Sequence, residues 1–248
     1  MPDLLSLAVL TCVGVIAGFI NVTAGGGSTL TLPALIFLGL DSSVANGTNR
    51  IAILLQNVSA VQSFKQENFF DLKTSLKLSF FTLPGSVAGA LLAIRVEDEL
   101  FKVILGIIMI GIVISMILPK KKANNKDEPN KPSTGIYLSM IGIGFYGGFI
   151  QVGVGFLLMA SLQFLMKLDL VRVNMYKVFI VLIYTIPALL IFILTDNVNW
   201  LLGIFLAIGN ILGGWWGAKM QIKKGEGLIK SVLAIAVFIM ALKLLDVF

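Results

Sequence analysis

Histidine is absent from this chain of 248 residues, and cysteine occurs only once, at Cys12. The chain therefore has no imidazole that could ligate a metal or titrate near neutral pH, and no pair of thiols for a disulfide. We expect no cofactor, no metal site and no enzymatic activity of the kinds that depend on these groups.

Charged residues are scarce as well: they make up 13% of the chain, whereas soluble domains carry about 25%. Hydrophobic residues make up 57%, and the mean hydropathy is +0.96. Uncharged runs at residues 132–166, 178–195 and 197–218 approach or exceed the roughly 20 residues that cross a bilayer. The composition predicts an all-α polytopic membrane protein, embedded in the lipid bilayer and almost without a soluble part. Met1-Pro2-Asp3 lacks the positive charge that begins a signal peptide, so no cleavage is expected.

Carboxylates are missing from the middle of every predicted span. Each Asp and Glu lies in a loop, at a terminus or at the end of a span. Because histidine is absent too, the groups that usually relay protons across a membrane are not available. The net charge of +6 comes from basic residues clustered in loops, so we expect no nucleic-acid partner.

A polar tract interrupts the uncharged run of residues 4–40. It contains three successive glycines, Gly25 to Gly27, followed by Ser28 and Thr29. Each glycine weakens a helix by about 1 kcal/mol relative to alanine, and open backbone at membrane depth occurs only where protein buries it or it lines a cavity. The tract predicts a hairpin broken in mid-membrane, whose second helix starts at residues 28–29 and aims free N–H groups inward at an anion. The alternative is that the glycines only allow close helix packing.

The second half of the chain repeats the first. Residues 148–155 answer residues 18–25, again in the middle of an uncharged run, and Asn174 answers Asn46. The alternative is that apolar, glycine-rich helices resemble one another by chance, since small residues at a spacing of four are common in membrane helices. By the same rule we expect residues 85–89 and 209–217 to serve helix packing.

We divide the chain into a first transmembrane repeat at residues 1–118, a linker at 119–133 and a second transmembrane repeat at 134–248. Each repeat is a Gly-broken helical hairpin plus three transmembrane helices. Because this is an odd number of crossings, the two repeats are inverted relative to each other, an architecture common among secondary transporters.

Lysine-rich loops set the predicted orientation, because such loops stay in the cytoplasm. Counting spans from the lysine-rich linker at 119–133 places the basic segments 65–77, 167–172 and 219–230 on the cytoplasmic side as well. Both termini are predicted outside. We expect a multi-pass membrane protein.

Arg50 and Lys177 are the cations that lie well inside predicted spans. A charge there costs at least ~2.5 kcal/mol, which favours a cavity or a polar partner. The alternative is that both side chains snorkel to the interface. The residues predicted to bind the substrate are Asn21, Thr23, Gly25, Gly26, Gly27, Ser28, Thr29, Asn49, Arg50, Gln151, Gly153, Gly155 and Lys177.

On these residues the chain resembles the sulfite exporter TauE/SafE family of membrane permeases. The likeness rests on residues 18–28, on residues 45–49 and on a weaker echo at 144–155, and it covers essentially the whole chain. The resemblance implies an inner-membrane protein that transports small sulfur-containing anions, such as sulfite or organosulfonates. The second motif departs from the triple glycine, since Phe156 stands opposite Gly26.

The favoured function is an exporter of such an anion, with alternating access between the two hairpin-bearing halves. The negative interior of the cell would drive efflux by about 2.3 kcal/mol per charge per 100 mV. An anion channel, or a permease for another small organic anion, is the alternative. A membrane-embedded enzyme or an assembly subunit ranks last. The expected partners are a small anionic substrate and the bilayer, and a homodimer stays open as the oligomeric state.

Overall fold

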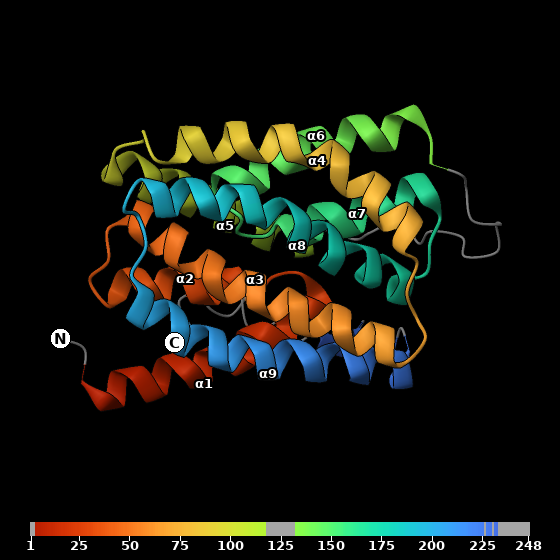
Figure 1. Ribbon diagram of the computed structural model, residues 1–248, viewed down its shortest axis with the longest axis horizontal. Coiled ribbons are helices and arrows are strands. Elements are labelled where there is room, and N and C mark those ends of the chain that lie inside the picture. The colour runs from red at the N-terminus through yellow and green to blue at the C-terminus, as the bar shows by residue number, and fades with distance from the viewer. Residues whose placement is uncertain (1–2, 118–131, 226, 230, 233–248) are drawn as a thin grey trace.

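The computed structural model describes residues 3–117, 132–225, 227–229 and 231–232, which form helices and short connections without any strand (Figure 1). Nine helices lie in this part of the chain: α1 (Leu4–Ala24), α2 (Ser28–Phe37), α3 (Ser42–Gln66), α4 (Leu72–Ala93), α5 (Asp98–Ile117), α6 (Thr134–Phe149), α7 (Val154–Met166), α8 (Leu170–Leu194) and α9 (Trp200–Lys224). The predicted all-α class is confirmed for these residues.

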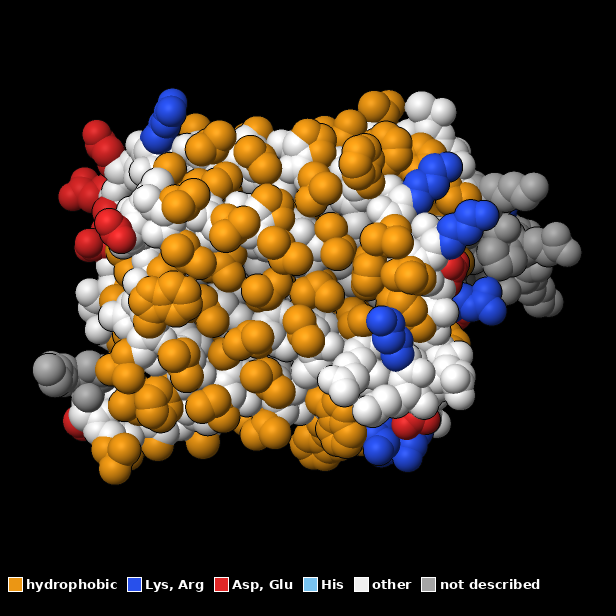
Figure 2. All heavy atoms as spheres, viewed as in Figure 1, with side chains coloured by type: hydrophobic (Ala, Val, Ile, Leu, Met, Phe, Trp, Pro, Cys, Tyr) orange, Lys and Arg blue, Asp and Glu red, His pale blue; other side chains and the backbone are white. Residues whose placement is uncertain are grey.

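Four of these helices, α1, α4, α8 and α9, are long and apolar enough to cross a bilayer. Figure 2 shows a broad hydrophobic belt across the middle of the face in view, with acidic side chains gathered at one end and most basic side chains at the other. A surface of this kind is favourable only where hydrocarbon replaces water around it. The structure therefore has the surface of a polytopic membrane protein.

The connections between helices alternate between the two ends of the molecule (Figure 1). The N-terminal end of α1 and the turns α2–α3, α4–α5 and α8–α9 lie at the acidic end. The turns α3–α4 and α7–α8, and the last residues of α9, lie at the basic end. This is the predicted order of ends, although which end faces the cytoplasm stays a prediction. The linker at 119–133, apart from its last two residues, and residues 233–248 lie outside the described residues.

The two hairpins enter from opposite ends, α1 from the acidic end and α6 from the basic end (Figure 1). Their returning helices are short: α2 has 10 residues and α7 has 13. At 1.5 Å per residue these helices reach about 15 and 20 Å, less than the ~30 Å hydrocarbon core. Neither returning helix spans the core by itself, so we expect both hairpins to re-enter with their tips inside the membrane. An inverted repeat predicts that the hairpins enter from opposite ends. That the two complete halves of the chain are inverted relative to each other stays a prediction.

Eight of the nine described helices, all except α5, group into two bundles that mix the two halves of the sequence. We call α1, α2, α3 and α9 the first bundle, and α4, α6, α7 and α8 the second bundle. In the first bundle α9 packs against α1 and α3, and in the second α4 packs against α6 and α8. Each half of the chain therefore lends one helix to the bundle built mainly by the other half.

Glycines make these exchanged helices fit closely. A Cβ atom added at Gly85 or Gly89 of α4 would collide with backbone carbonyl oxygens of α6, and one at Gly209 or Gly213 of α9 would collide with those of α1. Small residues of this kind let membrane helices approach until their backbones touch. The predicted packing role of these glycines is confirmed.

One predicted boundary is wrong. We expected a polar loop over residues 65–77, but α4 begins at Leu72. The carboxylate of Asp71 accepts a hydrogen bond of 3.2 Å from the N–H of Thr74 and so caps the helix start. The lysines that suggested a loop, Lys73 and Lys77, are exposed on the first turns of this helix.

Candidate functional site

The first hairpin breaks at the glycine tract. Helix α1 ends at Ala24, and Gly25 has φ +90°, a left-handed conformation that L side chains rarely adopt. Its N–H donates to the carbonyl oxygens of Asn21 at 2.9 Å and Ile20 at 3.1 Å, which closes the end of α1. Helix α2 then starts at Ser28. The predicted break and the predicted helix start are both confirmed.

The second hairpin breaks a few residues earlier than its glycines suggested. Helix α6 ends at Phe149, Gln151 and Gly153 have φ values of 62° and 73°, and α7 begins at Val154. Gly155 is therefore the second residue of α7 and not part of the opening. Its glycine is needed for a different reason, because it faces the tip of the first hairpin.

The two tips touch each other in the interior. A Cβ atom added at Gly25 would lie 2.7 Å from the carbonyl carbon of Gly155, and one added at Gly26 would lie 2.7 Å from the ring of Phe156. The ring of Phe156 thus occupies the space that a side chain at residue 26 would need. Phe156 stands where a second triple glycine would have a glycine. Its ring fills the space beside Gly26, while the backbones of Gly25 and Gly155 remain in contact.

A small cavity lies beside this contact. Its volume is about 10 Å³, room for roughly one water molecule. The lining residues are Asn21, Ser28, Asn57, Gln151, Val154, Gly155, Lys177 and Val181. The structure thus brings together, around one cavity, five of the residues predicted to bind substrate. The cavity must widen before it can admit a polyatomic anion.

Helix starts contribute to the walls of this cavity. Ser28 is the first residue of α2, and Val154 and Gly155 are the first two residues of α7. The first N–H groups of a helix have no partner within it and carry partial positive charge. Two positive helix ends therefore meet at the cavity.

Lys177 supplies the charge that borders this cavity. It is the eighth residue of α8 and only 2% exposed. Its Nζ atom donates to the carbonyl oxygens of Asn21 at 3.0 Å and Val22 at 2.9 Å, and to Oδ1 of Asn174 at 2.7 Å. The ammonium of α8 in the second bundle thus closes the C-terminal end of α1 in the first.

Arg50 does the same for the other hairpin. It is fully buried on α3, and Nη1 donates to the carbonyl oxygen of Gly147 at 3.1 Å and to Oε1 of Gln151 at 2.8 Å. Nη2 donates to the carbonyl oxygen of Gly148 at 2.5 Å and to Oδ1 of Asn46 at 3.4 Å. The guanidinium of α3 in the first bundle thus closes the C-terminal end of α6 in the second. Arg50 is not among the residues that line the cavity.

The snorkelling alternative is wrong for both cations. A snorkelling side chain reaches the polar interface, whereas Arg50 and Lys177 are 0% and 2% exposed and end on backbone carbonyl groups in the interior. The C-terminal ends of α1 and α6 carry partial negative charge, which is why two cations are stable there.

Three other predicted residues turn their polar atoms to neighbouring protein groups. Thr23 donates to the carbonyl oxygen of Phe19 at 2.7 Å, and Thr29 donates to that of Gly26 at 2.6 Å. Asn49 accepts a 2.7 Å bond from the hydroxyl of Thr31, which ties α2 to α3. These contacts stabilise the hairpin rather than line the cavity.

Sequence reasoning missed four amides near the broken helices. Asn57 lines the cavity, and Gln56 accepts a 3.3 Å bond from the amide of Asn21. Asn46 donates to the carbonyl oxygen of Phe149 at 2.7 Å, and Asn174 donates to that of Thr23 at 2.8 Å. The repeat did match Asn46 with Asn174, and this signal could have identified both as caps of the broken helices.

The balance of charge around the tips is positive. None of the Asp and Glu residues in the described ranges is buried, and each lies in a connection or in the first turn of a helix. The partial charges of two helix starts and two helix ends cancel approximately, which leaves the full charges of Arg50 and Lys177. A buried charge without a counter-charge is unfavourable, so this region favours a bound anion.

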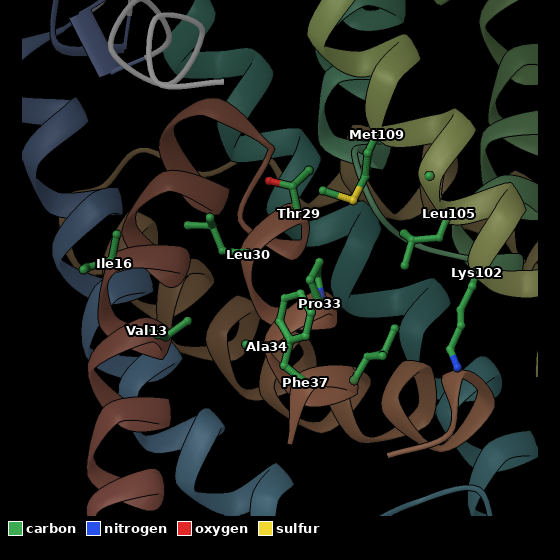
Figure 3. Close-up of a pocket in the computed structure, with 12 residues that line it drawn as sticks. Val13, Ile16, Thr29, Leu30, Pro33, Ala34, Phe37, Lys102, Leu105 and Met109 are labelled. Carbon is green, nitrogen blue, oxygen red and sulfur yellow. The ribbon is translucent and has the colours of Figure 1, made fainter. Parts of the chain in front are cut away.

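A larger groove, of about 620 Å³, lies between α1, α2 and α5. Figure 3 shows its lining, which is apolar except for Thr29 and Lys102. Thr29 is its only predicted site residue, and the hydroxyl of Thr29 is bonded within the hairpin. The groove therefore does not compete with the cavity at the tips as the candidate site.

Known proteins are similar to this chain over nearly its whole length. The sequence profile described as "Sulfite exporter TauE/SafE" matches residues 10–244. The chain is 28% identical over 240 residues to a Haemophilus influenzae protein named "Probable membrane transporter protein", covering 96% of this chain and 94% of that one. It is 30% identical over 248 residues to Escherichia coli K12 "Probable membrane transporter protein YfcA", covering 99% and 91%. No solved structure matches.

Proposed function

The chain belongs to the sulfite exporter TauE/SafE family, and from this premise we propose that it carries a small sulfur-containing anion, such as sulfite or an organosulfonate, out of the cell. At the coarser level the function is plain: the chain is an integral membrane transporter and not an enzyme, as its relatives' names and its apolar helices indicate. The identity of the anion, the direction of transport and the mechanism are the proposal.

The observation that carries the proposal is the cavity at the two hairpin tips. It combines two helix starts, the amides of Asn21, Asn57 and Gln151, and the ammonium of Lys177. Every one of these groups can donate a hydrogen bond, and the surroundings contain no buried carboxylate among the described residues. Such a donor set suits an oxyanion, whose oxygens accept several bonds at once.

The closed cavity supports a carrier rather than an open pore. With room for about one water, it admits no hydrated ion in this state. We infer that access alternates when the two bundles shift against each other, because the tips of α1–α2 and α6–α7 belong to different bundles. In this proposal the moving bodies are the mixed bundles, and not the two halves of the sequence.

We also propose that the basic end faces the cytoplasm of the cell (inner) membrane. Most Lys and Arg side chains lie at that end, and basic loops stay in the cytoplasm. The interior-negative potential then drives the anion outward, by about 2.3 kcal/mol per charge per 100 mV.

Flux into proteoliposomes tests the proposed function. We expect wild-type protein to carry sulfite and methanesulfonate with saturation and with counter-transport, and to carry acetate more slowly. Lys177→Met should lower the sulfite flux roughly tenfold to a hundredfold, because it removes a charged donor at the cavity. Lys73→Met, which removes an exposed lysine of α4, is the matched control and should leave the flux unchanged.

The same assay separates the alternatives. Flux that does not saturate and shows no counter-transport would indicate a channel with this lining. Faster transport of acetate than of either sulfur anion would indicate a permease for another organic anion. Equal sulfite flux in wild type and Lys177→Met would refute the site.

A further inference from the structure

Two crossed clamps join the bundles at the broken helices. In one, Asn46 and Arg50 of α3 reach the last three carbonyl oxygens of α6, at residues 147–149. In the other, Asn174 and Lys177 of α8 reach three successive carbonyl oxygens near the end of α1, at residues 21–23. We call these the arginine clamp and the lysine clamp. Each uses one amide and one cation, and each extends from one bundle to the other.

The clamps differ in how they meet the cavity. Lys177 lines it, whereas neither Arg50 nor Asn46 does. Three oxygens accept the N–H bonds of Lys177, namely the carbonyl oxygens of Asn21 and Val22 and the side-chain oxygen of Asn174. The sulfur of Met159, at 3.9 Å, is a fourth and weaker acceptor. An ammonium group has no fourth donor. A solute that hydrogen-bonds to Nζ must therefore displace one of these acceptors.

The acceptors that Lys177 now holds are all neutral, and an oxyanion is a stronger one. The present bonds are already strengthened by the charge of the ammonium, and an anionic acceptor adds the attraction between two opposite charges. The exchange is favourable for the ammonium, and its cost falls on the clamp. Displacing a carbonyl oxygen of Asn21 or Val22 breaks a contact between α8 and α1. Displacing Asn174, which lies on α8 itself, removes the bond that orients its amide on the carbonyl oxygen of Thr23 in α1. Arg50 loses no contact in this exchange, because its four Nη bonds to Gly147, Gly148, Gln151 and Asn46 stay in place.

We propose that solute binding opens the lysine clamp and leaves the arginine clamp closed, so that the anion itself loosens the contact between the two bundles at the first hairpin. This inference deepens the proposed function and rests on it. It makes Asn174 a positioning residue that competes with the solute for Lys177. The two bundles are then expected to shift against each other only when the anion is bound.

Two substitutions at Asn174 test the competition because they have opposite expected signs. Asn174→Ala removes the competing oxygen, so sulfite should bind about threefold to tenfold more tightly. Asn174→Asp replaces it with a charged competitor that holds the ammonium, so sulfite should bind at least about tenfold more weakly. Binding is measured by calorimetry with the full chain in lipid nanodiscs, and folding is checked by thermal denaturation.

Asn46 offers a matched pair of controls on the other clamp. Asn46→Ala and Asn46→Asp change the same kind of contact next to Arg50, but away from the cavity. Both should change the affinity for sulfite less than about threefold. If Asn174→Ala does not fold, Asn174→Leu, of similar volume and without the oxygen, takes its place with the same expected gain.

The outcomes separate the two claims. If wild type binds and transports sulfite but both Asn174 variants weaken binding, Asn174 is merely structural and the clamp inference is overturned, while the proposed function stands. If the Asn46 pair shows the same opposite signs as the Asn174 pair, the assignment of competition to the lysine clamp alone is overturned. If wild type neither binds nor transports sulfite or methanesulfonate, the proposed function fails and the inference fails with it.

Discussion

In both broken hairpins a helix ends in the interior, where its last carbonyl groups need hydrogen-bond donors. The cation that supplies these donors differs between the two hairpins. Each helix that stops in mid-membrane leaves carbonyl groups without partners, and each receives an amide and a cation from the opposite bundle. The Nη atoms of Arg50 donate four hydrogen bonds, and its guanidinium carbon lies 4.8 Å from the centroid of the Phe192 ring. The ammonium of Lys177 lies at the edge of a cavity.

This difference indicates that Arg50 supports the fold, whereas Lys177 can bind the solute. A planar guanidinium has fixed donor directions that suit a permanent contact, whereas an ammonium on a flexible stem can turn from one acceptor to another. The arginine clamp therefore fits a structural role, and the lysine clamp fits a role in which contacts change.

The largest expected effect is the loss of the folded protein in Arg50→Met. This change leaves the carbonyl groups at the end of α6 and the side chain of Gln151 without their donors in the interior. Breaking a buried charged network by removing one partner costs about 3–5 kcal/mol. We expect little monodisperse protein after detergent extraction, as measured by size-exclusion chromatography. Normal yield and thermal stability would contradict the support role.

The second effect concerns the contact between the tips. Gly25→Ala should destabilise the protein by about 2–4 kcal/mol, because Gly25 combines φ +90° with direct contact to Gly155. Gly39→Ala is a matched control: Gly39 has φ +89° but no atom within 4 Å of the added Cβ. It should cost only about 1 kcal/mol of backbone strain. Equal losses of thermal stability would argue against close contact of the tips.

The third effect is a split between affinity and stability in two conservative exchanges. Lys177→Arg keeps the charge but puts a larger head group beside a cavity of about 10 Å³, so the KM for sulfite should rise about tenfold. Arg50→Lys should lower the thermal stability instead, because one ammonium cannot replace the four Nη contacts. Flux kinetics and melting curves on both variants check the split. A larger KM change in Arg50→Lys would reverse the assigned roles.

The smallest effect belongs to Asn49, which ties α2 to α3 through Thr31 and does not line the cavity. Asn49→Ala should cost about 1–2 kcal/mol of stability and leave the KM for sulfite unchanged. Substrate titration of the flux provides the check. A KM that rises as far as in Lys177→Arg would return Asn49 to the binding site.

Much of the first hairpin could be predicted from the sequence. Three successive glycines in an uncharged run have no stable helical alternative, so the break before Ser28 follows from local chemistry. The start of α4 was missed because Lys73 and Lys77 suggest a loop, whereas the cap on Asp71 decides the boundary. Similarly, Gly155 looked like part of an opening although it serves the contact with Gly25.

The roles of the cations could be predicted only in part. Their cost in the membrane indicates that Arg50 and Lys177 need partners, but the partners are carbonyl groups more than 90 residues away in the chain. Which carbonyl a side chain reaches depends on how the bundles pack, and α4 and α9 exchange places between them. Local patterns contain no information on that exchange, so Arg50 looked as much like a substrate ligand as Lys177.

The most direct measurement is the position of a bound oxyanion. Selenite has the shape and charge of sulfite, and its selenium atom gives an anomalous diffraction signal in crystals soaked with it. We predict one dominant peak between Ser28, Gly155 and Nζ of Lys177, which disappears in Lys177→Met crystals. A peak at another place, or no peak at concentrations that saturate transport, would contradict the claim that the two hairpin tips hold the anion.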